Sequence, residues 1–291
     1  MNRSAGLLIV LFFITIGAFA QPKLGISGSV DWETSRIEAE ISLDLASAGL
    51  RLPAGRTQAE AALSAAYLDL IRQHLLGLQA DSSSTLGDLA AAGDFSLPQI
   101  DAIANTAVVV PPAMRPDMRE ISSRYTIELS NVSAALLRHS RPAPAIRTLL
   151  PVSAANYTGI IIIAAEELPV HGMRSSALPI PCLFPKIWDT NMNLIYDRNM
   201  LDTRNTTMAR YSPVQNIFQN NPSGLSDELR QIVGDKPLRI FARGVFGIKP
   251  TDLIIDRNDA LLIISSEENR KLLAQGKVVF ILDDSVLRYK F

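Results

Sequence analysis

Residues 36–45, RIEAEISLDL, alternate strictly between apolar and polar side chains. A period of two maintained over such a length is the pattern of a β-strand that buries one face and leaves the other in water. The segment 25–32 lies close enough to pair with this strand through a turn at 33–35. This part of the chain is therefore expected to build on an antiparallel sheet with one solvated face.

A helix is predicted after a connection at 49–55. Thr57 and Glu60 have the spacing of a capping box, which marks a helix start. Apolar residues then recur every three or four positions, as Leu63, Tyr67, Leu70, Ile71, Leu75 and Leu78. That spacing gives one apolar stripe, so the helix is expected to pack on the sheet. His74 lies on the same side and is interpreted as a boundary residue rather than a metal ligand.

A long excursion follows this helix. Residues 81–116 are rich in Ser, Gly, Ala, Asp and Pro. Short helices are expected at 85–91 and 98–104, and an apolar patch at 107–110 precedes two prolines. Long excursions in compact domains are often functional, so this segment is a candidate contact surface. Strand alternation returns at 121–129.

The second half of the chain contains several short strands. A continuous apolar run at 157–164 predicts a strand buried on both faces. Residues 184–197 predict a hairpin whose polar loop uses Asn191 and Asn193, since asparagine tolerates left-handed φ. Further strands are expected at 238–245, 252–255, 261–264 and 278–282.

Two short helices are expected among these strands. Ser226 precedes the first, DELRQIV, which has acidic residues in its first turn and Gly234 behind it. Ser265 and Glu268 have capping-box spacing and open the second helix, which Gly276 closes.

A proline-rich stretch divides the chain. Residues 140–151, SRPAPAIRTLLP, contain three prolines and predict a linker, which we place at 141–151. We expect a signal peptide at 1–20, an α+β domain at 21–140 and a β-rich domain at 152–291. The predicted fold class is α+β, with an N-terminal helix-on-antiparallel-sheet domain and a mostly β C-terminal domain with short helices.

The first twenty residues have the pattern of a secretory signal peptide. Arg3 precedes an apolar run that is short for a membrane span, and Ala18 and Ala20 form a small-x-small cleavage site. We expect cleavage after Ala20, a periplasmic mature protein and no integral membrane segment after cleavage. The single cysteine, Cys182, lies far from the cleavage site, so neither a lipid anchor nor an internal disulfide is expected. Cys182 is interpreted as a small buried hydrophobe.

No residue pattern nominates a chemistry. The chain has no G-x-S-x-G elbow, Walker loop, H-E-x-x-H motif or Cys/His zinc spacing. His74, His139 and His171 fall in separate predicted elements, which disfavours a metal site. The adjacent carboxylates at 166–167 and 283–284 are interpreted as solvated strand ends, because neighbours on a strand point to opposite faces. We predict a non-enzymatic protein with no catalytic, cofactor-binding or metal-binding residues and no cofactor.

Charge and aromatic residues bear on the choice of partner. The net charge is −1 and no basic stripe stands out, so a nucleic-acid partner is not expected. Trp32, Trp188, Tyr196 and Tyr211 offer an alternative, because their amphipathic rings suit a glycan-stacking surface. Ordinary core or hairpin packing is the competing interpretation of the same four residues.

Three segments carry a resemblance to a known group of proteins. They are YTGIIII at 157–163, LFPKIWDTNMNLIYD at 183–197 and PLRIFARGVFGIKPTDLIIDRNDALLI at 237–263. The chain resembles exported bacterial envelope proteins related to the small surface-lipoprotein family and the N-terminal domain of flagellar assembly protein T. The resemblance implies a structural factor of the envelope or the flagellum and supplies no catalytic residues.

These observations favour a non-enzymatic periplasmic protein that is a structural or assembly component of the cell envelope, with the flagellum as one such structure. The partners expected are other envelope or flagellar proteins, with self-association as a further option. The alternative is a periplasmic module that binds glycan or peptidoglycan, and a deep pocket lined by Trp or Tyr would favour it.

Overall fold

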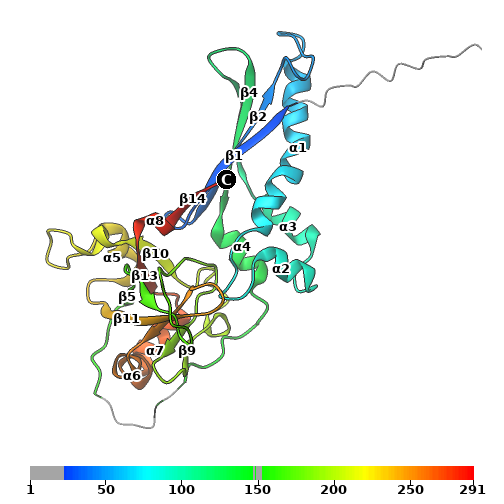
Figure 1. Cartoon of the computed structure of the whole chain (residues 1–291). Helices are drawn as coiled ribbons and strands as arrows, with labels where there is room; N and C mark the ends of the chain where they lie inside the picture. Colours follow the sequence, from blue (N-terminus) through cyan, green and yellow to red (C-terminus); the bar gives the residue numbers. More distant parts are fainter. Residues whose placement is uncertain (1–22, 147, 149–152) are drawn as a thin grey trace, which may run out of the picture.

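The computed structural model describes residues 23–146, 148 and 153–291. The predicted signal peptide at 1–20 and positions 147 and 149–151 of the predicted linker lie outside the described residues. The chain forms two large sheets with helices packed on them, which confirms the predicted α+β class. We call residues 23–136 together with 288–291 the arm, and residues 153–287 the base. Figure 1 shows the arm projecting from the base as a long, narrow unit.

The arm contains a five-stranded antiparallel sheet in the order β14-β1-β2-β4-β3. Its strands are β1 (Leu24–Asp31), β2 (Arg36–Asp44), β3 (Val108–Met114), β4 (Glu120–Glu128) and β14 (Arg288–Lys290). Strands β1 and β2 form the predicted hairpin, in which Val30 pairs with Ile37. The alternation of β2 is confirmed, because Ile37 and Ile41 are buried while their neighbours Arg36 and Glu38 are exposed.

One face of this sheet is covered by helices (Figure 1). They are α1 (Arg56–Leu76), α2 (Leu86–Ala91), α3 (Leu97–Ala104) and α4 (Leu129–Leu136). The predicted apolar stripe of α1 is confirmed, since Leu63 and Ile71 are fully buried. The Tyr67 ring stacks on Tyr125 of β4 with the centroids 3.9 Å apart, and its hydroxyl donates to the Ala104 carbonyl. The helix is therefore fixed to both the sheet and α3.

The capping box predicted for α1 is wrong. The helix begins at Arg56 with Gly55 as its N-cap, and no side chain caps it. Thr57 consequently lies inside the first turn. Glu60 instead forms an ion pair with Arg56, with Nε and Oε1 2.8 Å apart. The sequence spacing was compatible with both arrangements.

The base contains a seven-stranded mixed sheet in the order β10-β13-β5-β11-β12-β8-β9. Its strands are β5 (Ile160–Ile163), β8 (Ile187–Asp189), β9 (Leu194–Tyr196), β10 (Arg210–Pro213), β11 (Leu238–Phe246), β12 (Asp252–Ile255) and β13 (Val278–Leu282). Strands β10, β13, β5 and β11 are parallel. Strand β5 lies in the middle of this set and is buried on both faces, as its apolar run predicted. A separate ribbon joins β6 (Leu168–Pro169) and β7 (Ser176–Ala177).

Helices cover both faces of the base sheet. They are α5 (Asp227–Val233), α6 (Arg257–Ser265), α7 (Glu267–Ala274) and α8 (Asp284–Leu287), with 3₁₀ turns η1 (Arg198–Met200) and η2 (Val214–Ile217). Leu229 of α5 packs with Ile161 on one face. Ile263 of α6 belongs to the core of the other face, with Ile160 and Ile162. The helix predicted after Ser226 is confirmed, and the Ser226 hydroxyl accepts from the Leu229 N–H.

Two predictions for the segment after β12 are wrong. Residues 261–264 were expected to form a strand but lie in α6, whose N-cap is Asp256. The run Leu261–Ile264 is apolar and partly β-branched, so its composition alone suited a strand. The cap of the following helix is Ser266 rather than Ser265.

The predicted β8–β9 hairpin is confirmed, but its loop is held differently from the prediction. Asp189 is buried and accepts hydrogen bonds from the backbone N–H groups of Asn191 and Asn193, at 2.9 and 2.8 Å. The residue with left-handed φ is Met192, at 59°, rather than either asparagine. The carboxylate therefore stabilises a turn that lacks glycine.

The last residues of the sequence return to the arm. Strand β14 pairs with β1, and the backbone of Phe291 exchanges two hydrogen bonds with Gly28, each 3.0 Å long. The Phe291 ring stacks on His74 of α1, with centroids 3.9 Å apart. A side chain at position 28 would strike this ring, because a Cβ there would lie 2.6 Å from it. His74 is half-buried beside Phe291, in agreement with its interpretation as a boundary residue.

An ion pair also fixes β14 to β1. Arg288 donates to the buried carboxylate of Asp31. Burial alone would raise the pKa of Asp31, but the hydrogen bonds from Arg288 and the Thr34 N–H outweigh it and lower the pKa below its usual range. A lowered pKa in the folded state means that the pair stabilises the fold at neutral pH and ceases to do so as the carboxylate protonates.

The Arg288→Ala variant should therefore have a lower unfolding free energy than the original chain at pH 7, by a modest amount because the guanidinium is mostly exposed. The difference from the original chain should shrink as the pH falls below about 4, where the partner carboxylate begins to protonate. Urea unfolding at several pH values measures it. Arg174→Ala, at an exposed arginine without an ion pair in the described structure, is the control. A pH-independent difference would contradict the role given to Asp31.

Candidate interaction surfaces

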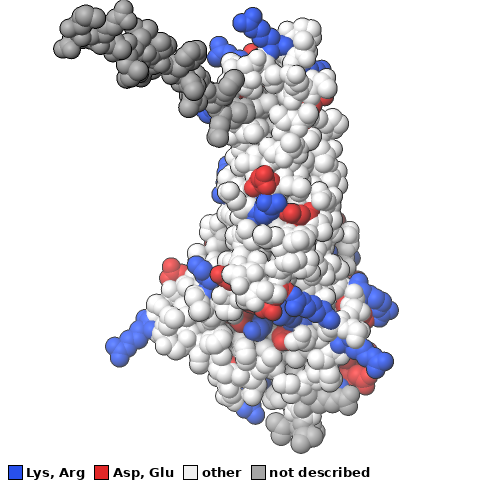
Figure 2. Space-filling model, turned by 90° about the vertical axis from the view of Figure 1, so that its right-hand side faces the viewer, with Lys and Arg blue, Asp and Glu red and all other residues white. Residues whose placement is uncertain are grey.

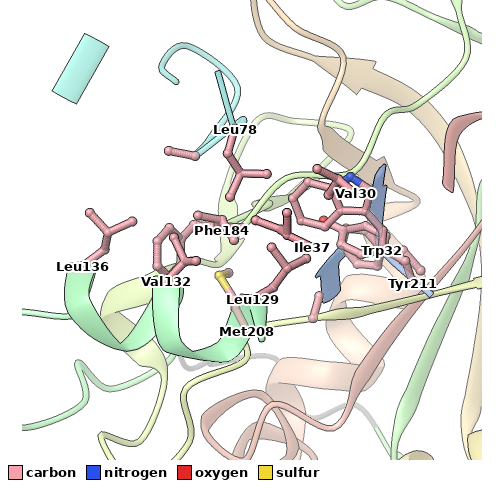
Figure 3. Close-up of a cluster of buried hydrophobic side chains, with 14 of the residues drawn as sticks. Val30, Trp32, Ile37, Leu78, Leu129, Val132, Leu136, Phe184, Met208 and Tyr211 are labelled. Carbon is pink, nitrogen blue, oxygen red and sulfur yellow. The ribbon is translucent and has the colours of Figure 1, made fainter. Parts of the chain in front are cut away.

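The arm and the base share a single apolar core at their junction. Figure 3 shows side chains from β1, β2 and α4 of the arm packed together with Phe184, Met208 and Tyr211 of the base. Trp32, at the end of β1, meets the Tyr211 ring edge to face with centroids 5.6 Å apart. The Tyr211 hydroxyl donates to the Cys182 carbonyl at 2.7 Å and accepts from the Cys182 N–H at 3.0 Å. This cluster joins the two parts through packing and hydrogen bonds.

Asp252 adds a buried polar connection to this junction. Its carboxylate is fully buried and accepts from the Ser82 hydroxyl of the arm at 3.0 Å. It also accepts from the Lys186 backbone N–H at 3.1 Å and from the Trp188 indole N–H at 3.2 Å. Burial raises the pKa of Asp252, although these hydrogen bonds oppose the shift. The carboxylate is saturated by structural partners, which favours a role in fixing the junction over one in chemistry.

Backbone hydrogen bonds also join the arm and the base. In the segment that follows α1, the Gln79 carbonyl accepts from the Leu183 N–H of the base, and the Ala80 carbonyl accepts from the Phe184 N–H. Gly247 lies against Ser82 so closely that a Cβ on it would lie 2.4 Å from the serine Cβ, and its φ is +116°. Only glycine fits there without a shift. Arm and base are therefore held as one rigid unit.

The clearest exposed apolar surface is the outer edge of the arm sheet. Strand β3 is the last strand in that sheet and pairs only with β4 among the described residues. Its residues Val108, Val109 and Val110 are 69%, 50% and 51% exposed. Pro111 and Pro112 follow, where the register shifts. We call Val108–Val110 the valine edge. An open edge with exposed valines can accept an added strand, and the prolines limit its length.

The valine edge lies in the segment that the sequence nominated as a contact surface. The predicted helical pieces of that segment are confirmed as α2 and α3, whereas residues 107–110, interpreted as an apolar patch before two prolines, lie largely in β3. The helix side of the arm differs from the base in its charge. Figure 2 shows few charged side chains along the arm on that side, and more at its tip and around the base.

A second surface is an open groove of about 850 Å³ in the base. Its walls are β10, through Arg210–Ser212, and α5, through Glu228, Gln231 and Ile232. The β1–β2 turn of the arm also lines the groove, and there the Asn216 side-chain amide donates to Glu33 at 3.1 Å and to Ser212 at 3.0 Å. The groove therefore lies where arm and base meet, beside the outer strand of the base sheet.

The three histidines lie apart. His74 stacks on Phe291, a ring nitrogen of His139 is hydrogen-bonded to the Leu201 carbonyl at 2.7 Å, and His171 is exposed near Phe246. Among the described residues, no group of three or more His, Cys, Asp or Glu side chains could hold a metal ion. Cys182 is buried, as interpreted from the sequence, and burial raises the pKa of its thiol. It is therefore not a nucleophile poised at neutral pH.

The adjacent carboxylates are also structural. Glu166 and Glu167 are exposed beyond β5, and Asp283 caps α8 by accepting from the Ser285 N–H at 2.9 Å. The hydrogen bonds from Ser285 lower the pKa of Asp283, so it stays ionised at neutral pH. The interpretation as solvated strand ends is confirmed for these residues. Strands β5 and β13 are parallel neighbours, so the two pairs of carboxylates follow the carboxyl ends of adjacent strands, at the same end of the sheet. The sequence did not indicate this arrangement.

The four aromatic residues considered for glycan stacking do not gather on one surface. Trp32 and Tyr211 are buried in the junction, and Tyr196 is fully buried with its hydroxyl bonded to the Met208 carbonyl at 3.0 Å. Trp188 packs on Phe246 and donates to Asp252. Packing thus accounts for all four.

None of the helices within the described ranges is both long and apolar enough to cross a bilayer.

The fold and these surfaces define a two-part α+β protein whose exposed features are a strand edge and a groove. Two family models match the chain. Residues 23–135 match the N-terminal domain of Treponema pallidum Tp0624, and residues 159–284 match the second domain of the same protein. The chain is thus similar to Tp0624 in two consecutive domains. No curated protein matches it. Neither family model names a surface lipoprotein or a flagellar protein, so that part of the resemblance stays a prediction.

Proposed function

We propose that this protein is a non-enzymatic structural or assembly component of the cell envelope, located in the periplasm, which holds a partner through its arm. The observation that carries the proposal is the valine edge, three exposed apolar residues on an open strand. Isolated exposed apolar residues are ordinary, but a contiguous set on an unpaired edge favours a protein contact. The signal-like first twenty residues support the location. The flagellum remains one candidate structure, on the resemblance alone.

The rigid junction supports the same function. A scaffold can hold a partner in a fixed position only when its own parts are rigidly joined. Here the arm and the base are joined by a shared core of buried side chains and by backbone hydrogen bonds. The glycan-binding alternative has less support. The groove in the base is large enough for a sugar chain, but its one aromatic lining residue, Tyr211, is buried with its hydroxyl engaged. Stacking on a sugar ring requires an open aromatic face.

A charge placed on the valine edge tests the proposal. The Val109→Lys variant should lose roughly tenfold in its binding to isolated envelope fragments, because a lysine opposes strand addition at an open edge. Co-sedimentation of the purified full chain with the fragments measures the bound fraction. Ile248→Lys, which changes another highly exposed apolar residue on the base, is the matched control and should bind like the original chain. Equal sedimentation of Val109→Lys and the original chain would contradict the proposal.

A further inference from the structure

Strand β14 covers only part of the outer edge of β1. It pairs with Ser29–Asp31, and Phe291 bonds to Gly28, so the chain ends part-way along β1 (Figure 1). In the part of the chain that the structure describes, no strand pairs with Leu24–Ser27 on this side. We call Leu24–Ser27 the open half of β1.

Hydrogen bonds at the two ends of the open half fix which of its backbone groups point outward. Gly28 bonds through both its N–H and its C=O to the C-terminal residue, on the outer side. The Lys23 carbonyl accepts from the Asp44 N–H of β2, on the inner side. Backbone groups of successive strand residues point to opposite sides. The N–H and C=O groups of Leu24 and Ile26 therefore point outward, like those of Gly28.

The open half lacks the usual protection of a sheet edge. Natural sheets protect such edges with prolines or charged side chains, whereas the open half has the sequence LGIS, with neither. Gly25 and Ser27 are exposed, and Leu24 and Ile26 are half-buried against the core of the arm. An edge with unpaired N–H and C=O groups is a template for a further strand.

We propose that the open half binds the open half of a second copy of this chain, in antiparallel pairing about a twofold axis at Gly25. In this register Leu24 of each copy lies opposite Ile26 of the other, and the two residues exchange both N–H···O=C bonds. All four outward groups of each copy are then paired. A second copy is the occupant that supplies donors and acceptors at the matching spacing.

The hydrogen-bonding groups determine this register. A shift of the pairing by two residues would place Leu24 opposite Gly28, whose groups are already bonded to Phe291. A shift by two in the other direction would place Ile26 opposite Pro22, which has no N–H to donate. A shift by one would oppose residues whose side chains point to different faces of the sheet.

The side chains of the paired strands also match. Leu24 and Ile26 face the helix side of the sheet, because the residues that they pair with in β2 are fully buried. The pairing therefore packs apolar side chains of the two copies against each other. On the open face, Gly25 lies opposite Gly25 and Lys23 lies opposite Ser27, so no like charges meet. The two arms run antiparallel, which places the bases at opposite ends of the dimer.

This inference goes beyond the proposed function, and it uses the edge of the arm sheet opposite the valine edge. The two arm sheets would join into one sheet, whose outer edges are the two valine edges. Each dimer would therefore present two contact surfaces to a partner. The pairing is short, so we expect a weak dimer with a Kd in the micromolar range.

A cysteine at the twofold axis tests the proposal. The two Gly25 residues form a non-hydrogen-bonded pair, whose Cα atoms lie about 4.5 Å apart, within disulfide range. Ser27 provides the matched control on the same face of the same strand, since its two copies would lie about 14 Å apart. With copper phenanthroline as oxidant, we expect Gly25→Cys to form a covalent dimer at least roughly tenfold faster than Ser27→Cys. The native Cys182 is buried and does not interfere.

Sedimentation velocity measures the noncovalent dimer at about 100 µM of the full chain, purified after export. Leu24→Pro removes one outward N–H and keeps the hydrogen bonds to β2, so it should weaken the dimer at least roughly tenfold. Val109→Lys should leave the dimer unchanged, so the two edges of the arm can fail separately. The melting temperature of each variant verifies that it folds.

Four results would each overturn the proposal. They are a monomer at this concentration, equal rates of cross-linking for the two cysteine variants, an unchanged dimer in Leu24→Pro, and loss of the dimer in Val109→Lys. The last of these would assign self-association to the valine edge instead.

Discussion

Replacing Asp252 with alanine is expected to lower the free energy of unfolding by about 4 kcal/mol. The variant removes the acceptor of four donors, which are the hydroxyls of Ser82 and Thr251, the Lys186 N–H and the Trp188 indole N–H. A buried donor without a partner costs about 1–3 kcal/mol, and these four cannot all find water at a junction where Asp252 is fully buried. Urea unfolding followed by circular dichroism measures the loss.

Two further variants make the result specific. Asp252→Asn keeps one of the two accepting oxygens and removes the buried charge, but its NH2 group faces either the Lys186 N–H or the Trp188 N–H, so it should cost about 2 kcal/mol, less than Asp252→Ala. Glu166→Ala removes an exposed carboxylate of the base and should change stability by less than about 0.5 kcal/mol. If Asp252→Ala were as stable as the original chain, Asp252 would not fix the junction.

Replacing Trp32 with alanine is expected to cost about 4 kcal/mol, the usual range for removing a large buried aromatic ring. Trp32 is only 4% exposed and packs on Tyr211 of the base. Its loss would open a cavity between the arm and the base, so we expect the arm to unfold at lower urea than the base in this variant. Urea unfolding measured separately for the arm and the base shows whether the two parts unfold at different urea concentrations.

The conservative variant at the same position serves as the control. Trp32→Phe keeps an aromatic ring against Tyr211 and should cost about 1–2 kcal/mol without separating the two transitions. A Trp32→Ala chain that still unfolds in one step, with a small loss of stability, would show that the remaining contacts of the junction suffice.

Local patterns in the sequence predicted those elements that are buried either on one face only or on both faces throughout. The alternation at 36–45 became β2, and the stripe from Leu63 to Leu75 became the buried face of α1. The apolar run at 157–164 became a strand buried on both sides. In these segments the burial that tertiary packing imposes agrees with the periodicity of the chain, which is why the pattern is sufficient.

The errors occurred where tertiary contacts decide between alternatives. Residues 261–264 suit a strand by composition, yet Asp256 caps a helix that buries Ala260, Ile263 and Ile264. A polar cap five residues upstream of the run was the available signal. Residues 107–112 were not assigned to a strand, because prolines usually exclude central strands, but an edge strand tolerates them.

The candidate surfaces depend on partners that one sequence does not reveal. Ser82 and Asp252 are 170 positions apart, and neither residue type is unusual in a loop or at a strand start. Strand β14 is short and exposed, so the sequence contains no periodic pattern that would predict its pairing with β1. The groove lies beside β10 because β10 is the outermost strand of its sheet. The order of strands in a sheet is a property of the topology and not of a local sequence pattern.

Hydrogen exchange of the full chain in increasing urea tests most directly whether arm and base form one rigid unit. Peptic fragments covering β2 and β4 report on the arm, and fragments covering β5 and β13 report on the base. A shared core predicts that the most protected amides of both sheets open in a single global transition, with the same unfolding free energy and the same urea dependence. Loss of protection in the arm at clearly lower urea than in the base would show two independent units and contradict a rigid scaffold.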